Sequence, residues 1–144
     1  MLQFKGQSYA TALAEIHAQC FETPWPEPVF SDLLKLPTTF GYMTPECFVL
    51  CADLGEDVEI LTIAVLPTQR RKGLATALLQ TLQTAVIKHN KHHIFLEVKC
   101  TNIPAISLYK KNGFIQTGCR KNYYHEQGHT EDALCFTWEQ KTSE

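Results

Sequence analysis

The 144-residue sequence lacks a long apolar run, an excess of one charge, internal repeats and low-complexity segments. No apolar segment reaches the roughly 18 residues that span a membrane, so no membrane contact is expected. The 13 Lys and Arg nearly balance the 15 Asp and Glu, which disfavours a nucleic-acid partner because such binders usually carry a basic excess. The chain start has no apolar signal-peptide core, so we expect a cytoplasmic protein.

The six cysteines follow no metal-binding or disulfide pattern. Without a secretion signal they are expected to be reduced and mostly buried. No C-x-x-C pair occurs, and Cys47, Cys51 and the His92-His93 pair match no usual ligand spacing, so no metal is expected. The length suits one domain, residues 1–144, with its own hydrophobic core.

Hydrophobic spacing predicts an α/β fold with a mixed sheet and helices on its faces. Helices are expected over residues 8–21, with Ser8 or Thr11 as N-cap, over 29–36, over 73–89 and after Thr101-Asn102. Strands are expected over residues 39–43, 47–53, 58–65, 93–99, 114–124 and 133–139, the last two joined by a turn over 126–129. The order is β-α-α-β-β-β-α-β-α-β-β, and the part from residue 58 onward carries the strongest signal.

The stretch from Ile63 to Ala75 reads as a strand, a polar turn and the start of a helix. Such a start directs unpaired backbone N–H groups and the positive end of the helix dipole at one place, where a phosphate can bind. Arg70, Arg71 and Lys72 add positive charge there, and Gly73 lets a ligand approach the backbone. The stretch therefore predicts a phosphate-bearing cofactor, with an ordinary solvated connection as the alternative.

Three further motifs lie downstream: Glu97-Val98-x-x-x-Asn102, Leu108-Tyr109-x-x-x-Gly113-Phe114 and Gly118-Cys119-Arg120-Lys121-Asn122-Tyr123-Tyr124. Together with Arg70-x-x-Gly73-x-Ala75, they make the chain resemble the GNAT superfamily of acyl-CoA-dependent N-acyltransferases. It is most similar to the RimI-type protein N-terminal, or ribosomal-protein-alanine, acetyltransferases. The resemblance covers about residues 59–136 and is loose before that.

The resemblance implies the GNAT fold: a mostly antiparallel central sheet, with one parallel pair of strands at the cofactor groove. It also implies acetyl-CoA as co-substrate, its pantetheine arm on the strand at 63–65 and its pyrophosphate over the turn at 71–76. That strand is expected to bulge and to splay from the strand of Glu97, which would free a backbone N–H to polarise the acetyl carbonyl. The implied cofactor-binding residues are Ile63, Ala64, Val65, Arg70, Arg71, Lys72, Gly73, Leu74, Ala75, Thr76, Asn102 and Tyr109.

The implied catalytic residues are Glu97 and Tyr109. Strand alternation places Glu97 on the face of Lys99, and the resemblance makes it the general base, acting directly or through a water. Tyr109 would be the acid that protonates the departing thiolate. The alternatives are a Glu97–Lys99 ion pair, ring packing for Tyr109 and a helix N-cap role for Asn102.

The acceptor is less well defined, because the first 58 residues depart most from the family. Trp25, Tyr123 and Tyr124 resemble positions that line the peptide groove, with loop packing as the alternative for Trp25. An α-amine is about 3–4 kcal/mol easier to deprotonate than a lysine near neutral pH, so a modestly tuned carboxylate suits an N-terminal substrate as base.

The favoured function is direct acetyl transfer to a protein N-terminal α-amine, for example that of a ribosomal protein. The alternatives are transfer to a lysine or small amine, and a CoA-binding module without catalysis. Such a module would need neither Glu97 nor Tyr109.

Overall fold

The computed structural model describes residues 1–126 and 128–141 and shows a seven-stranded mixed sheet in the order β1-β2-β3-β4-β5-β7-β6. Among the described strands, β4 and β5 form the one parallel pair. The predicted fold class and order of elements are confirmed. The elements are β1 (Leu2–Phe4), α1 (Ala10–Ala18), α2 (Glu27–Leu34), β2 (Thr39–Thr44), β3 (Cys47–Asp53), β4 (Asp57–Val65), α3 (Leu74–Lys88), β5 (His93–Lys99), α4 (Ile103–Lys111), β6 (Ile115–Glu126) and β7 (His129–Glu139), with 3-10 turns at Gln7–Tyr9 and Pro67–Gln69.

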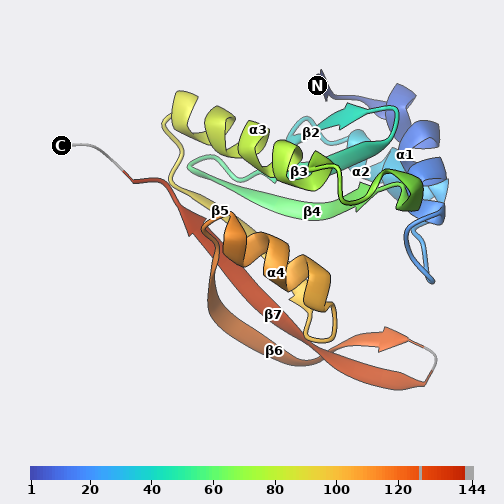
Figure 1. Ribbon diagram of the computed structural model, residues 1–144. Helices are drawn as coiled ribbons and strands as arrows, with labels where there is room; N and C mark the ends of the chain where they lie inside the picture. The colour runs from blue at the N-terminus through green and yellow to red at the C-terminus, as the bar shows by residue number, and fades with distance from the viewer. Residues whose placement is uncertain (127, 142–144) are drawn as a thin grey trace.

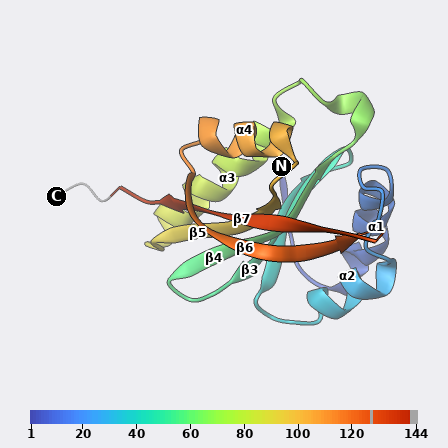
Figure 2. The ribbon, with the colours of Figure 1, turned by 90° about the horizontal axis from the view of Figure 1, so that it is seen from below.

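Two hydrophobic layers cover the sheet, one on each face. Helices α3 and α4 pack on one face through side chains such as Leu79, Leu82 and Ile106. Helices α1 and α2 pack on the other, where Leu13 and Phe30 are fully buried. Figures 1 and 2 show this division, with α3 and α4 on one side of the strands and α1 and α2 on the other. Each helix thus buries one apolar stripe against the sheet, as its spacing of apolar residues requires.

The start of α1 differs from the prediction. The helix begins at Ala10 after the 3-10 turn Gln7–Tyr9, and its N-cap, Tyr9, makes no side-chain cap. Ser8 lies in the 3-10 turn and Thr11 inside the helix, so neither caps it. The propensity for a hydroxyl cap is outweighed here by tertiary packing, because Ala10 and Leu13 are buried against the sheet.

Strands β4 and β5 pair over only three residues and then separate. Asp57, Val58 and Glu59 lie opposite His93, Ile94 and Phe95, and the described ladder between the two strands ends there. In Figure 1 the two strands start together and diverge, with α3 over one half of the sheet and α4 over the other. The edge of β4 that faces β5 is therefore unpaired from residue 60 onward, and the expected splay is confirmed.

A β-bulge in β4 lies at Leu61, not within 63–65 as expected. In the ladder with β3, Ile60 pairs with Cys51 and Thr62 with Leu50, so Leu61 is the extra residue. The bulge reverses the alternation of side chains: Val58 and Ile60 before it, and Ile63 and Val65 after it, all pack under α3 and α4. Without an extra residue, the later pair would face the other side.

The β6–β7 hairpin is longer than predicted on its second strand, which begins at His129. Of the predicted turn over 126–129, Gln127 lies outside the described residues. Figures 1 and 2 both show the hairpin reaching toward the side of the molecule where α1 lies. No helix in the described part of the chain is long and apolar enough to cross a membrane.

Candidate active site

The turn before α3 presents an uncapped helix start. Gly73 is the N-cap, in the left-handed conformation at φ 77°, and no side chain caps the helix. The N–H of Ala77 makes the first helical bond, to the carbonyl of Gly73, so the preceding N–H groups have no helical acceptor. A Cβ placed on Gly73 would meet nothing within 4 Å, which leaves open space beside these donors. Free backbone donors beside open space are what an anion at a helix start requires, and the anion site itself stays a prediction.

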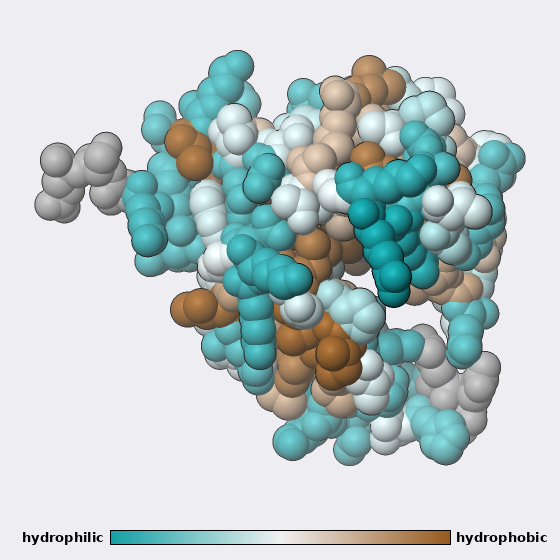
Figure 3. Space-filling model, in the orientation of Figure 1, coloured by the Kyte–Doolittle hydropathy of each residue, from teal (hydrophilic) through white to brown (hydrophobic). Residues whose placement is uncertain are grey.

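The three basic residues of this turn do not all point the same way. Nε of Arg70 donates to the carbonyl of Val65 at 3.1 Å, which turns this side chain back toward the end of β4. Nζ of Lys72 donates to Oε1 of Gln69 at 3.0 Å. Arg71 is exposed and has a left-handed backbone at φ 66°. Figure 3 shows the most hydrophilic side chains of this face over the turn, beside a hollow with apolar atoms in its walls.

Glu97 lies on the opposite face of the sheet from this turn. Its neighbours Leu96 and Val98 are buried under α3 and α4, so strand alternation directs Glu97 toward the α1 and α2 side. The carboxylate lies on β5 beyond the last β4–β5 pair, at the open gap between the strands. Among the described residues, its Oε2 is buried without a hydrogen-bond partner.

Arg120 links Glu97 to the aromatic residues of the hairpin. Arg120 belongs to the sequence motif at residues 118–124, but its contact with Glu97 was not predicted. Its Nη2 lies 3.4 Å from Oε1 of Glu97, and its guanidinium lies 5.2 Å from the centre of the Tyr123 ring. The rings of Tyr123 and Tyr124 meet edge to face at 5.3 Å. Nζ of Lys99, the residue of the alternative ion pair with Glu97, lies over the Tyr124 ring at 5.5 Å.

Tyr109 of α4 lies on the α3 and α4 side of the sheet. It is buried in the core, with ring centres of Phe114 and Phe136 at 5.7 and 6.3 Å. Burial, and to a smaller extent the nearby Tyr124, raise the pKa of the Tyr109 hydroxyl above its ordinary value. The phenol therefore keeps its proton across the physiological range and can donate a hydrogen bond.

Asn102 is the N-cap of α4: its side chain accepts a bond from the N–H of Ala105 at 3.3 Å. The N-cap role is therefore present. It satisfies one of the free donors of the helix start and leaves the side-chain N–H₂ group for another acceptor.

Trp25 belongs to an aromatic cluster around His17. Its ring lies 5.2 Å from the imidazole and 5.5 Å from Phe30, so the predicted packing role is present. Nδ1 of His17 accepts the backbone N–H of Trp25 at 3.0 Å, and Nε2 lies 3.3 Å from Oγ1 of Thr62, the residue after the bulge. His17 thus ties the loop before α2 to the bulged strand, a link that sequence reasoning missed.

Glu59 is a second carboxylate at the gap that sequence reasoning missed. It lies opposite Phe95 in the last described pair of β4 and β5, and it is half-buried. Burial raises the pKa of Glu59, the charge of Glu97 raises it further, and Arg120 opposes both effects. The available signal was a single acidic residue inside an otherwise apolar strand, Val58-Glu59-Ile60-Leu61.

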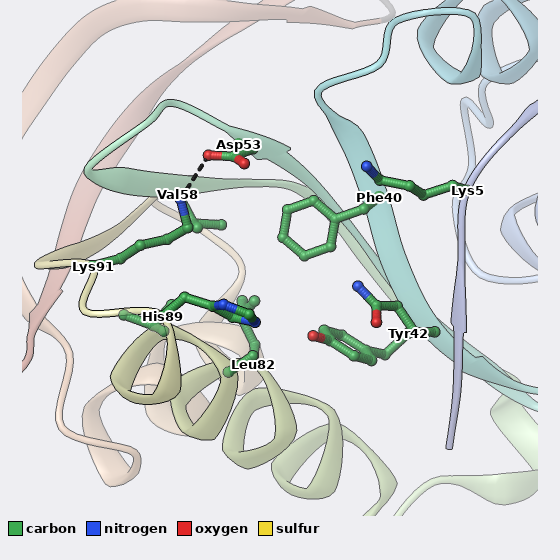
Figure 4. Close-up of a pocket in the computed structure, with 11 residues that line it drawn as sticks. Lys5, Phe40, Tyr42, Asp53, Val58, Leu82, His89 and Lys91 are labelled. Carbon is green, nitrogen blue, oxygen red and sulfur yellow. Dashed lines mark hydrogen bonds and ion pairs between the residues drawn. The ribbon is translucent and has the colours of Figure 1, made fainter.

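A separate hollow of about 360 Å³ lies near the C-terminal end of α3, away from the turn that begins this helix. Figure 4 shows Phe40, Tyr42 and Leu82 around it, with an ion pair between Lys91 and Asp53 at 2.8 Å on its margin. None of the predicted site residues lines it, so this hollow is separate from the candidate active site.

The gap between β4 and β5 has an uncapped helix start on one face and a carboxylate on the other, an arrangement that suits a group-transfer enzyme with two substrates. The acetyltransferase (GNAT) family matches residues 10–114, and the chain belongs to this family.

The chain is also similar to named N-acetyltransferases. The chain is 31% identical over 129 residues to the ribosomal protein bS18-alanine N-acetyltransferase of Escherichia coli, covering 85% of this chain and 86% of that one. It is 46% identical over 120 residues to an N-alpha-acetyltransferase of Sulfolobus acidocaldarius, covering 83% of this chain and 62% of that protein. The crystal structure of the Escherichia coli ribosomal-protein-S18-alanine N-acetyltransferase superposes with a TM-score of 0.88 at 25% identity, over 99% of this chain and 96% of that one.

Proposed function

We propose that this protein transfers the acetyl group of acetyl-CoA to the N-terminal α-amine of a protein, by direct attack in a ternary complex. The observation that carries the proposal is the β4–β5 gap, which has Glu97 on one face of the sheet and the uncapped start of α3 on the other. Relatives that act on the alanine of ribosomal protein bS18 support a ribosomal-protein terminus as the acceptor. The proposed place of action is the cytoplasm.

The donor side fits acetyl-CoA, which would supply an activated acetyl group and carries phosphates. The free N–H groups before Ala77 and the open space at Gly73 suit the pyrophosphate. The unpaired edge of β4 beyond Glu59 offers backbone groups to a pantetheine arm. We assign the cofactor-binding role to the turn backbone and Arg71 first, since Arg70 and Lys72 already have partners in the chain.

The acceptor side offers the chemistry that an α-ammonium needs. Only the neutral amine attacks, so a carboxylate must take a proton. Glu97 is partly buried and has an oxygen without a partner, which an ammonium or a water would satisfy. The exposed ring of Tyr123 lies against the Arg120 guanidinium that pairs with Glu97 and can contact the first residues of a peptide. On the donor side we assign the acid role to Tyr109, whose buried hydroxyl holds its proton.

The test is incubation with acetyl-CoA and three acceptors, followed by mass spectrometry: a peptide with a free N-terminal alanine, the same peptide with a blocked N-terminus and an internal lysine, and a small polyamine. Acetylation of the first at the α-amine is expected. Product only on lysine or polyamine would replace the N-terminal assignment, and binding of acetyl-CoA with no product on any amine would identify a non-catalytic module. Glu97→Gln should retain acetyl-CoA affinity and have a lower turnover.

A further inference from the structure

The carboxylate of Glu59 lies with that of Glu97 at the gap between β4 and β5. Glu59 occupies the last paired position of β4, directly opposite Phe95. Residues opposite one another in a parallel pair point to the same face, and Phe95 and Glu97 share a face by alternation. Glu59 and Glu97 therefore face the α1 and α2 side together, one from each strand, where the two strands begin to separate.

The surroundings of the two carboxylates differ. Arg120 holds Glu97 through a 3.4 Å ion pair, which favours its charged form. No ion pair between Glu59 and a cation is found among the described residues. Half-buried, it has Ala52 of β3 as its neighbour on the other side.

The charges that shift the pKa of Glu59 come from other strands of the sheet. Glu97 comes from β5 and Arg120 from β6, and these two act on it. Asp57, two residues earlier on β4, is already paired with His93 of β5 at 2.9 Å. A like charge nearby disfavours a second ionised carboxylate, so Glu97 adds to the effect of burial and raises the proton affinity of Glu59.

We propose that Glu59 and Glu97 act as one base, with Glu97 staying ionised beside Arg120 and Glu59 receiving the proton of the acceptor ammonium. This inference rests on the proposed acetyl transfer. One N–H bond of the ammonium breaks, directly or through one water, its electron pair stays on nitrogen, and an O–H bond forms on Glu59. The neutral amine is then free to attack, and Glu59 later returns its proton to solvent. The unpartnered Oε2 of Glu97 is the acceptor that orients the ammonium.

The kinetic test compares the pH dependence of kcat/KM for the parent, Glu59→Gln, Glu97→Gln and the double variant, with Glu56→Gln as matched control. Glu56 is exposed in the turn before β4 and loses the same charge. Glu59→Gln should lower kcat/KM by about 100-fold or more and abolish the acidic limb of the profile. Glu97→Gln should move that limb to lower pH, since the charge that raises the proton affinity of Glu59 is gone. The double variant should lose little beyond the more impaired single variant, because the two act as a unit.

Two results would overturn the inference. One is a Glu59→Gln profile that keeps the acidic limb of the parent, with kcat/KM either unchanged or lowered equally at all pH values. The other is a carbon NMR titration of labelled glutamates in which the Glu59 carboxyl titrates identically in the parent and in Glu97→Gln. The NMR titration needs no turnover and no folded Glu59 variant. Failure of the proposed function would instead appear as a parent protein that acetylates no N-terminus, and it would leave the titration result standing.

Discussion

The buried imidazole of His17 should cost the protein about 2 kcal/mol of unfolding free energy as the pH falls from 8 to 5, and replacing His17 should remove this loss. The ring is 2% exposed, and it is neutral because its Nδ1 accepts the backbone N–H of Trp25. Its proton therefore lies on Nε2, which donates to Thr62. A second proton would have to go on Nδ1, where it would face the N–H of Trp25 and break that bond.

The magnitude follows from the burial of the ring, which lowers the pKa of His17 from 6.5 to about 4. The folded pKa is below the unfolded one, so the unfolded chain binds more protons as the pH falls, and stability declines from about pH 6.5 toward pH 4. At pH 5 the ring is almost fully protonated in the unfolded chain and about a tenth protonated in the folded one, a difference of about 2 kcal/mol. The full effect, below both values, is about 3 kcal/mol.

The assay is urea unfolding of the parent and His17→Asn at pH 8, 7, 6 and 5. Asparagine keeps an oxygen acceptor near the position of Nδ1 and cannot titrate. The variant will be less stable at pH 8 because the ring contacts with Phe21 and Trp25 are lost, so the quantity compared is the change in the parent-minus-variant difference with pH. His129→Asn, at an exposed position, controls for the loss of one histidine.

The difference should shrink by about 2 kcal/mol between pH 8 and pH 5, as the parent alone loses the contribution of His17. A difference that stays constant over this range would refute the buried, neutral ring. If His17→Asn does not fold, proton NMR of the imidazole in the parent gives the same answer: a midpoint near the ordinary histidine value contradicts the argument.

Three further outcomes are expected. Gly41→Ala should lower the free energy of unfolding by about 1–3 kcal/mol in urea titration, because its Cβ would overlap the carbonyl of Val49 and the ring of Phe4; unchanged stability would contradict the close strand packing. Tyr109→Phe should slow acetyl transfer by about 100-fold in a steady-state assay while the apolar packing of the ring preserves the fold; an equal rate would leave Tyr109 as a packing residue. Asp57 and Glu139, which bind the His93 ring, raise the pKa of His93. The stability that these ion pairs contribute is therefore complete below about pH 6.5 and is lost as the pH rises through the raised value. His93→Gln should remove this alkaline loss from a plot of unfolding free energy against pH, and an unaltered plot would show that the ion pairs contribute nothing.

The regular elements could be predicted from the sequence because their signals are local. The stripe of Leu79, Leu82 and Val86 in α3 is fully buried as its helical spacing requires. Asn102 caps α4 as its side chain and position suggest. The alternation of β5 placed Glu97 on the correct face, opposite Leu96 and Val98. Each of these inferences depends on residues within a few positions of one another.

The contacts that build the candidate site are long-range and could not be read in the same way. The Arg120–Glu97 pair joins β6 to β5 across β7, and the His17–Thr62 contact spans 45 positions. The bulge at Leu61 has no glycine or proline to mark it in the sequence. It arises because Val58 and Ile60 before it and the apolar residues after it pack on the same face of the sheet.

The bulge and the gap together explain how one sheet can bring two substrates into contact. Glu59 and Glu97 lie on the α1 and α2 face, whereas Tyr109 and the turn at Gly73 lie on the α3 and α4 side. A continuous β4–β5 ladder would close the sheet and separate the two sets of groups. Because the ladder ends at Glu59, a group held on one face can reach a nucleophile on the other through the sheet itself. In the proposed reaction each face would contact one substrate, so substitutions of residues other than Glu59 and Glu97 on the first face should change the KM of the acceptor, and substitutions at the turn should change the KM of the donor.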